Sequence, residues 1–264
     1  MKYLVKTNDI GTLTDAYYNR IVYDSTTGFV YCKDAKPYEY VDLGLDSHLK
    51  WAKCNIGAIS EEESGLYFQW GDTQGYTAKQ VGNGGGLKAF NLADYKWSVD
   101  GSSSNFSKYN RSDSKTVLNP EDDAAHVIMG GKWRMPTLAE YNELCLKTDI
   151  YLVPTEGEEI KGTARVNGKG VMINWASQPK GNLKGVKFYK QGDKQTYMFV
   201  PAAGNAYRGS VQDVVQYGGL WSSSLYSSGV QNAWYFYFYA YNGNVDYDDR
   251  YFGLPVRGVL PQQI

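Results

Sequence analysis

The residues best suited to contact another molecule lie near the C-terminus of the 264-residue chain. Residues 234–239 read Trp-Tyr-Phe-Tyr-Phe-Tyr. Because a β-strand points successive side chains to opposite faces, we expect the tryptophan and the two phenylalanines to face the core and the three tyrosines to face outward. Tyrosine combines a large rigid ring with a hydroxyl and loses little rotamer entropy on binding. The chemistry that this row predicts is molecular recognition.

A second strand is expected after a turn at residues 242–244, and it carries Val245, Tyr247 and Tyr251. Seven tyrosines lie between Tyr226 and Tyr251. Two interpretations are open, because these tyrosines could complete the core of an ordinary hairpin or could form an exposed platform. Large exposed aromatic patches usually mark interaction sites, and the number of tyrosines favours the platform.

Residue types used in catalysis are few and scattered. His48 and His126 are the two histidines, and His126 is expected to form a structural hydrogen bond in a helix. No Gly-x-Ser-x-Gly nucleophile elbow occurs. Residues 162–170 contain glycines, but they lack the spacing of a phosphate loop and a Ser or Thr after Lys169. We therefore expect no enzymatic activity and assign no catalytic residue.

The sequence gives no clear metal or disulfide signal. The 3 cysteines are widely spaced and form no Cys-x-x-Cys pair, so neither a zinc site nor a disulfide framework is expected. Asp246, Asp248 and Asp249 carry oxygens that calcium could use, but calcium needs about six to eight oxygens converging on one point. Aspartates spread along a strand do not converge in this way, so we expect no metal and no cofactor.

Charge and hydropathy exclude two classes of partner. The chain has 27 basic and 28 acidic residues, a net charge of −1, whereas nucleic-acid binding by phosphate neutralisation needs a basic excess. No apolar run reaches the roughly 18 residues of a membrane-spanning helix. Residues 1–9 lack the apolar segment of a secretory signal. We expect no nucleic-acid partner, no membrane insertion and no signal peptide.

Two helices are expected in the middle of the chain. The first has Asn119 as its cap and Pro120 as its first residue and continues to Met129. The second begins at a capping box formed by Thr137 and Glu140. Residues 71–117 are polar and glycine-rich, which predicts a long irregular loop. Short strands are expected at residues 49–56, 66–70, 170–175, 186–189 and 197–201. The fold class is α+β, since no βαβ alternation occurs.

The N-terminal part of the sequence differs from the remainder. Residues 17–31 predict a hairpin with a turn at Ser-Thr-Thr-Gly, residues 25–28, and Pro37 ends the pattern. We expect residues 1–36 to be an extension used for attachment or oligomerisation. Residues 37–264 are expected to form one ligand-binding domain.

A series of short motifs runs in order along this domain and carries a resemblance. The motifs are YVDLGL (40–45), LKWAKCNIGA (49–58), YFQWG (67–71), EDDAAH (121–126), GGKWRMPTLAE (130–140), FVPAAG (199–204), WSSSL (221–225) and PVR (255–257). Together they resemble the Fibrobacter succinogenes major paralogous domain, a family common in gut Bacteroidetes and their phages. That family is similar to C-type-lectin-fold proteins, which include formylglycine-generating enzymes and the variable proteins of diversity-generating retroelements.

The resemblance implies a C-type-lectin-like fold with two helices, short antiparallel strands and long loops. In retroelement variable proteins, adenine-directed mutation makes codons near the C-terminus hypervariable. The resemblance implies that the ligand-binding positions here are Tyr235, Tyr237, Tyr239, Tyr241, Asn242, Asn244, Asp246, Tyr247, Asp248, Asp249, Tyr251 and Phe252.

The resemblance also implies partners and a location. The expected ligand is a protein or glycan on a bacterial surface, and the expected location is a phage tail or the bacterial cell surface, in a homo-oligomer such as a trimer. A non-diversified adhesion domain is the alternative. A formylglycine-generating oxidase is a third reading, but Cys32, Cys54 and Cys145 lie outside the C-terminal part where its cysteines are expected.

Overall fold

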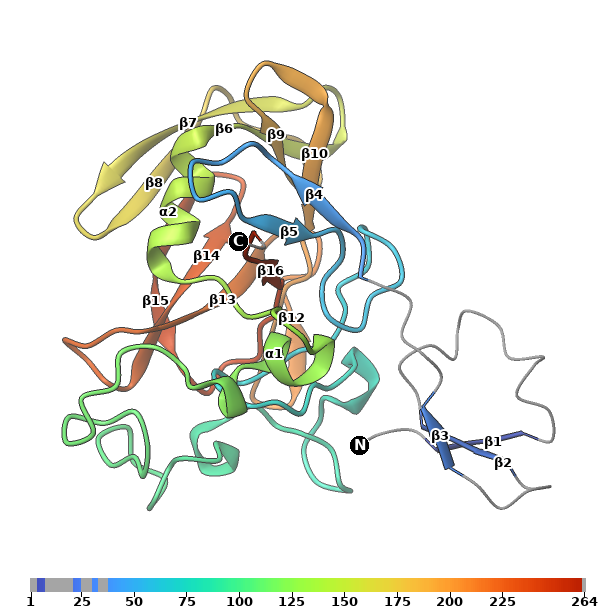
Figure 1. Ribbon diagram of the computed structural model, residues 1–264. Helices are drawn as coiled ribbons and strands as arrows, with labels where there is room; N and C mark the ends of the chain where they lie inside the picture. The colour runs from blue at the N-terminus through green and yellow to red at the C-terminus, as the bar shows by residue number, and fades with distance from the viewer. Residues whose placement is uncertain (1–3, 8–20, 25–29, 33–37, 263–264) are drawn as a thin grey trace. The chain divides into compact units, whose positions relative to one another are not determined.

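Antiparallel strands dominate the structure, as the tyrosine- and glycine-rich composition predicts. The computed structural model describes residues 4–7, 21–24, 30–32 and 38–262, and it divides the chain into two units, residues 1–39 and 40–264. In the first unit, β1 (Leu4–Thr7) pairs in parallel with β2 (Ile21–Asp24), which pairs antiparallel with β3 (Val30–Cys32) (Figure 1). The β2–β3 pairing agrees with the predicted hairpin, whose turn lies outside the described residues.

The second unit is built on an eight-stranded sheet with the order β10-β9-β6-β7-β8-β15-β14-β13. Every neighbouring pair in it is antiparallel. The strands are β6 (Thr148–Glu156), β7 (Ile160–Asn167), β8 (Gly170–Trp175), β9 (Lys180–Lys190), β10 (Asp193–Pro201), β13 (Gly218–Leu225), β14 (Asn232–Phe238) and β15 (Asn242–Asp249).

Two smaller sheets complete this unit. In one, β5 (Lys50–Ala52) lies between β4 (Tyr40–Asp42) and β16 (Val259–Leu260), so the two ends of the unit lie side by side. In the other, β11 (Asn205–Tyr207) pairs with β12 (Ser210–Gln212). The strand expected over residues 49–56 corresponds to β5, which is only three residues long.

The first expected helix is interrupted. A 3-10 turn, η5 (Pro120–Asp122), precedes α1 (Ala124–Met129), and the N-cap of α1 is Asp123, whose carboxylate accepts a hydrogen bond from the His126 main-chain N–H. Asn119 makes no capping hydrogen bond. The extended backbone of Asp123, with ψ 111°, breaks the helix at that point. The prediction of one continuous helix from Asn119 to Met129 is wrong for this reason.

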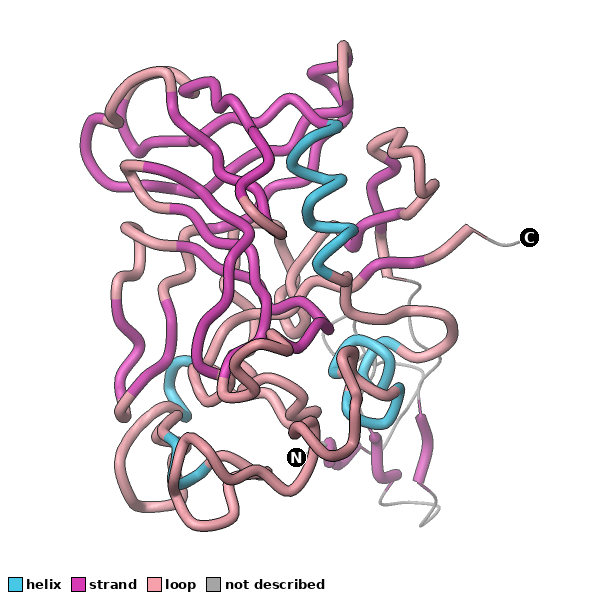
Figure 2. Tube along the Cα trace, turned by 90° about the vertical axis from the view of Figure 1, so that its left-hand side faces the viewer, coloured by secondary structure: helices cyan, strands magenta, loops and turns pink. Residues whose placement is uncertain are grey.

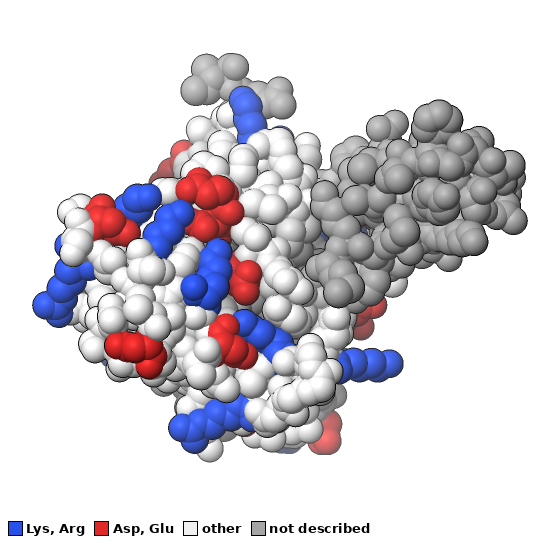
Figure 3. Space-filling view, turned by 90° about the horizontal axis from the view of Figure 1, so that it is seen from below, with Lys and Arg blue, Asp and Glu red and all other residues white. Residues whose placement is uncertain are grey.

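The second expected helix, α2 (Leu138–Lys147), is confirmed together with its capping box of Thr137 and Glu140. It lies along one side of the large sheet (Figure 2) and contacts β8, β13 and β6. Residues 71–117 form a long loop region, as expected, with two short 3-10 helices, η3 (Ala78–Gln80) and η4 (Leu92–Asp94). On the face seen from below in Figure 3, basic and acidic side chains lie among one another.

Two aromatic cores occupy opposite faces of strands β13 and β14. The first core lies against α2 and contains Phe236 and Phe238. The second core contains Trp221 and Tyr235 and is closed by aromatic residues of the long loop region, among them Trp97. Strand β14 is therefore covered on both faces along most of its length.

Candidate ligand-binding face

Strands β14 and β15 form the C-terminal hairpin that the sequence predicts, but its turn falls earlier than expected. The main-chain N–H of Tyr239 donates to the carbonyl of Asn242 at 2.8 Å, so residues 239–241 make the turn. Residues 242–244, where the turn was expected, begin β15 instead. The exposed residues at the hairpin tip are thus Tyr239 and Tyr241.

The register fixes which side chains share a face. Tyr235 lies opposite Asp246, Tyr237 lies opposite Asn244, and Ala233 lies opposite Asp248. Directly opposed residues point to the same face of a sheet. Two tyrosines, one asparagine and two aspartates therefore face the same way, and we call this the tyrosine face.

Tyr235 is not an outward-facing residue. Its side chain is only 5% exposed, and its ring lies 5.7 Å from Trp221 and 5.1 Å from Tyr237 between ring centroids. The expectation that Tyr235 is exposed on the platform is wrong, because the long loop region packs onto this end of the strand. Burial also raises the pKa of the Tyr235 hydroxyl.

Exposure increases along the tyrosine face toward the hairpin tip. Tyr237 is half-buried, Tyr239 is 40% exposed and Tyr241 is 76% exposed. Beneath them lies Tyr217, a buried residue whose ring is 4.7 Å from that of Tyr239 and 6.2 Å from that of Tyr237. Tyr237 and Tyr239 therefore pack on a buried aromatic residue, which limits the entropy they lose when they bind.

Polar groups of the tyrosine face are held in defined positions. The side-chain amide of Asn244, which is buried, donates to the Tyr237 hydroxyl at 2.9 Å and to Asn242 Oδ1 at 3.2 Å. Burial, together with the nearby carboxylates of Asp249 and Asp246, raises the pKa of Asp248 to about 6. A carboxyl group with a pKa near neutrality in a partly open site is typical of functional surfaces.

A second aromatic group lies where the chain leaves β15. The Tyr251 hydroxyl donates to Asp249 Oδ2 at 2.7 Å, and the Phe252 ring lies 5.2 Å from that of Tyr251 and 4.5 Å from that of Tyr207. Both Tyr251 and Phe252 are half-buried. Tyr207 packs on this group, as Tyr217 packs on Tyr237 and Tyr239, and sequence reasoning missed both. Their only signal was that each is an aromatic residue within two positions of a glycine.

Tyr247 belongs to the other face of the sheet. It lies opposite Trp234, and its ring stacks on that of Tyr226 with 3.6 Å between centroids. Because alternate residues of β15 point to opposite faces, Tyr247 cannot join Tyr237 and Tyr239 in one surface. The prediction that all these residues form a single face is wrong for Tyr247 and also for Asp249, which lies opposite Asn232 on the same face as Tyr247.

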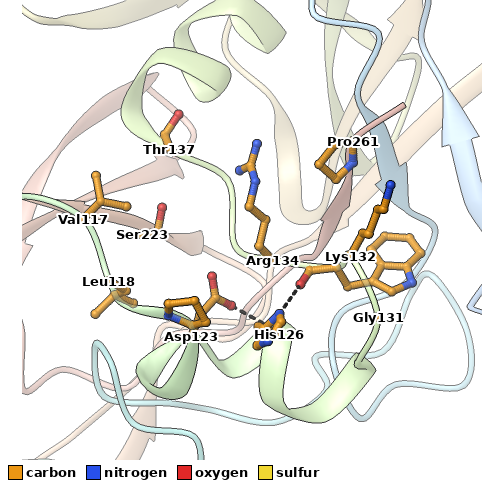
Figure 4. Close-up of a pocket in the computed structure, with 12 residues that line it drawn as sticks. Val117, Leu118, Asp123, His126, Gly131, Lys132, Arg134, Thr137, Ser223 and Pro261 are labelled. Carbon is orange, nitrogen blue, oxygen red and sulfur yellow. Dashed lines mark hydrogen bonds between the residues drawn. The ribbon is translucent and has the colours of Figure 1, made fainter. Parts of the chain in front are cut away.

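A separate cavity of about 420 Å³ is lined by residues that include Asp123, His126, Arg134 and Ser223 (Figure 4). Asp123 accepts hydrogen bonds from the main-chain N–H groups of His126 and Met135, and not from the imidazole. The His126 ring instead contacts the Trp133 carbonyl through Nδ1 at 3.3 Å, and Arg134 points away from both residues. These residues do not form a Ser-His-Asp arrangement, and His126 has the structural role expected of it.

Cysteines and metal-ligand types are equally dispersed. Cys145 is buried in the first core, and burial raises the pKa of its thiol. Cys54 is half-buried. Within the described ranges, no group of three or more His, Cys, Asp or Glu side chains is placed to hold a metal ion.

No protein-family model, curated protein or solved structure matches this chain. In the part of the chain that the structure describes, no helix is both long enough and apolar enough to cross a membrane. The function must therefore be inferred from the geometry of this chain itself.

Proposed function

We propose that this chain is a ligand-binding protein with a C-type-lectin-like fold, and that its tyrosine face recognises a bacterial surface protein or glycan. The observation that carries the proposal is the exposure of Tyr239 and Tyr241 at the hairpin tip, with the Tyr239 ring packed on the buried ring of Tyr217. Rigid aromatic side chains with free hydroxyls are the residues that dominate binding hot spots.

Three features of the architecture support the C-type-lectin-like part of the proposal. The two ends of the larger unit pair through β5 and β16. Two helices precede the large antiparallel sheet, and a long loop region packs against the strands that carry the tyrosine face. The same features accord with the family resemblance carried by the sequence motifs.

The packing also supports diversification of this face by a retroelement. Phe236 and Phe238 are buried in the first core, whereas Tyr237, Tyr239 and Tyr241 contact other chain segments less completely. Substitutions at the hairpin tip therefore remove little buried area, so the fold tolerates sequence change there. We propose a phage tail or a bacterial surface as the location, with a homotrimer as the assembly.

The oxidase alternative gains no support from the cysteines. Cys145 lies on the face of α2 that is buried in the first core, where its raised pKa disfavours the reactive thiolate. A non-diversified adhesion domain would have the same binding face. It would differ only in that no diversifying retroelement lies beside its gene. A neighbouring reverse transcriptase and a near-repeat of the segment for residues 235–252 with differences at adenines would separate these two readings.

A cell-adhesion assay tests the proposal. Beads coated with the full chain are mixed with a panel of gut Bacteroidetes strains, and bound cells are counted. We expect retention of some strains, reduced about tenfold or more by Tyr239→Ala combined with Tyr241→Ala. Tyr40→Ala is the matched control, since Tyr40 is an exposed tyrosine of β4. Equal retention by all three proteins, or by none, would overturn the proposal.

A further inference from the structure

A second group of aromatic side chains lies on the side of the sheet opposite to the tyrosine face. The rings of Tyr226 and Tyr247 stack with 3.6 Å between their centroids and 12° between their planes. Trp234 lies nearly perpendicular to both, with its centroid 5.4 Å from that of Tyr226 and 5.7 Å from that of Tyr247. Each ring is held by the other two, so these side chains lose little freedom when a ligand binds to them.

This aromatic group borders a cavity of about 280 Å³. Trp234 and Val245 line the cavity from the sheet, Tyr226 and Tyr247 from the stacked pair, and residues 167–169 from the β7–β8 turn. The volume lies at the lower end of the range of small-ligand sites, which is roughly 300–1,000 Å³. The cavity therefore has room for one ring-sized unit of a ligand.

The order of the strands shows which face of the Tyr247 ring borders this cavity. Strand β15 lies between β8 and β14. Tyr226 follows β13 and covers the ring from the β14 side, whereas the β7–β8 turn leads into β8 on the other side. The ring face toward the turn is therefore the free one, and Tyr247 is 40% exposed.

Both walls of the cavity are fixed by hydrogen bonds. The main-chain N–H of Tyr226 donates to the Asn232 carbonyl at 3.1 Å, and the Tyr226 carbonyl accepts from the Gly229 N–H at 3.0 Å. On the other wall, the Lys169 carbonyl accepts from Asn142 Nδ2 at 2.8 Å, which ties the turn to α2. The cavity is therefore formed before a ligand arrives, as small-molecule sites usually are.

The rim of the cavity carries polar side chains that are available to a ligand. Asn167, Lys169 and Ser228 are exposed, and in the described part of the chain none of these three side chains has a hydrogen-bond or ion-pair partner. Asp246 also lines the cavity, but its side chain points to the tyrosine face, because it lies opposite Tyr235. An ammonium group donates, whereas an amide or a hydroxyl both donates and accepts. These groups therefore suit a ligand that carries several hydroxyls.

We propose that this cavity binds one pyranose unit of a glycan, whose ring lies on the free face of Tyr247 and whose hydroxyls bond Asn167, Lys169 and Ser228. The face of an aromatic ring is electronegative, and one side of a pyranose presents apolar, weakly positive C–H groups. Stacking the two removes apolar surface from water, while the rim groups replace the water that the sugar hydroxyls bond.

Other ligand classes fit the cavity less well. An aromatic side chain of a protein would fill the space beside Tyr247 but would leave the polar groups of the rim without partners. A phosphate group is best held by several cationic donors, and Lys169 is the only cationic residue that lines the cavity. A sugar unit uses both the aromatic face and the rim.

This site is separate from the tyrosine face. Tyr247 lies opposite Trp234 and Tyr237 lies opposite Asn244, so the rings of the two tyrosines point to opposite faces of the sheet. Variants can therefore distinguish the two sites. Tyr247→Ala removes the stacking surface of the cavity, whereas substitutions at the hairpin tip leave the cavity intact.

The test applies the full chain to an array of oligosaccharides from bacterial capsules and lipopolysaccharides, followed by calorimetric titration of the glycan that binds best. We expect its Kd to rise about tenfold in Tyr247→Ala and about threefold or more in Lys169→Ala. Tyr247→Phe keeps the ring and should bind as the natural protein does. The Kd should also stay unchanged in Tyr239→Ala combined with Tyr241→Ala, and in Lys180→Ala, which removes an exposed lysine of β9.

Other outcomes overturn the proposal. An array without bound glycans does so, even where beads coated with the chain still retain cells through the tyrosine face. So does a bound glycan whose Kd is the same in Tyr247→Ala as in the natural protein. A glycan that is lost in the Tyr239 and Tyr241 variant but retained in Tyr247→Ala would place glycan recognition on the tyrosine face instead. Because Lys169 is exposed, Lys169→Ala should unfold at the same temperature as the natural protein, so that its loss of affinity is not a loss of folding.

Discussion

Tyr237 and Asn244 face each other across β14 and β15, and the Asn244 amide donates a 2.9 Å hydrogen bond to the Tyr237 hydroxyl. Asn244 is 6% exposed, so the bond is shielded from water on the asparagine side. Tyr237 lies between buried Tyr235 and exposed Tyr239. This one bond therefore ties the outer part of the tyrosine face to the packed part.

A double-mutant cycle should detect this bond. Asn244→Ala and Tyr237→Phe should each lower the free energy of unfolding by about 1 kcal/mol, the usual net value of one hydrogen bond. The double variant should cost less than the sum, because both changes remove the same bond. Urea unfolding measures the three values. Strict additivity would show that the bond contributes nothing.

The raised pKa of Asp248 predicts a pH dependence of stability. Its pKa of about 6 lies above the value near 3.9 of an unfolded chain, so the folded protein binds more protons than the unfolded chain between those values. The free energy of unfolding therefore falls as pH rises from about 4 to about 6. Above that pH the contribution of Asp248 no longer changes. Asp248→Asn removes this contribution.

We expect Asp248→Asn to be more stable than the natural protein at pH 7 to 8, and the difference to vanish near pH 4. Asparagine keeps an oxygen that can accept from the Asp249 N–H, so the local backbone is preserved. Free energies of unfolding at several pH values give the difference curve. A curve independent of pH would contradict the assignment.

Helix ends were predictable where a side chain has one available partner. Thr137 and Glu140 satisfy each other's main-chain N–H groups, and both are named by a local pattern. Asn119 and Asp123 both precede residues suited to a helix. Asp123 is the N-cap in the structure, where its carboxylate is also held by the Met135 N–H. A contact twelve residues away cannot be read from a local pattern.

The alternation of the hairpin was predictable, but its exposure was not. Phe236 and Phe238 face the core as the period of two requires. The burial of Tyr235 depends on the long loop region that carries Trp97, which packs on the opposite face. The many aromatic residues within that polar loop were the available signal, since such residues need a surface to cover.

Gly170 allows the close approach of β8 to β15. A β-carbon at this position would lie 1.8 Å from the Val245 carbonyl oxygen, a main-chain atom that cannot move aside. Gly170→Ala should therefore destabilise the protein by about 2 kcal/mol or more, measured by urea unfolding. Gly229→Ala is the control, because its nearest atom belongs to the flexible side chain of Gln231. Equal losses would contradict this explanation.

Arg250 and Arg257 are both fully buried, yet their polar atoms differ in partners. Arg257 donates to Asn55 Oδ1 and to three main-chain carbonyls. Arg250 donates to the Tyr109 carbonyl, its Nε and Nη2 have no hydrogen-bond partner among the described residues, and its guanidinium lies 4.0 Å from the Phe106 ring. The burial of these two charges depends on distant segments, so it could not be predicted from the sequence.

The two arginines should therefore respond differently to the same substitution. Methionine in place of Arg257 leaves four acceptors without this donor, three of them buried, and each buried one costs about 1 kcal/mol or more. Methionine in place of Arg250 leaves one such acceptor and relieves the desolvation that lowers the pKa of this guanidinium. Arg257→Met should thus lose about 2 kcal/mol more than Arg250→Met in urea unfolding. A larger loss at Arg250 would instead show that its cation–π contacts outweigh its unpaired nitrogens.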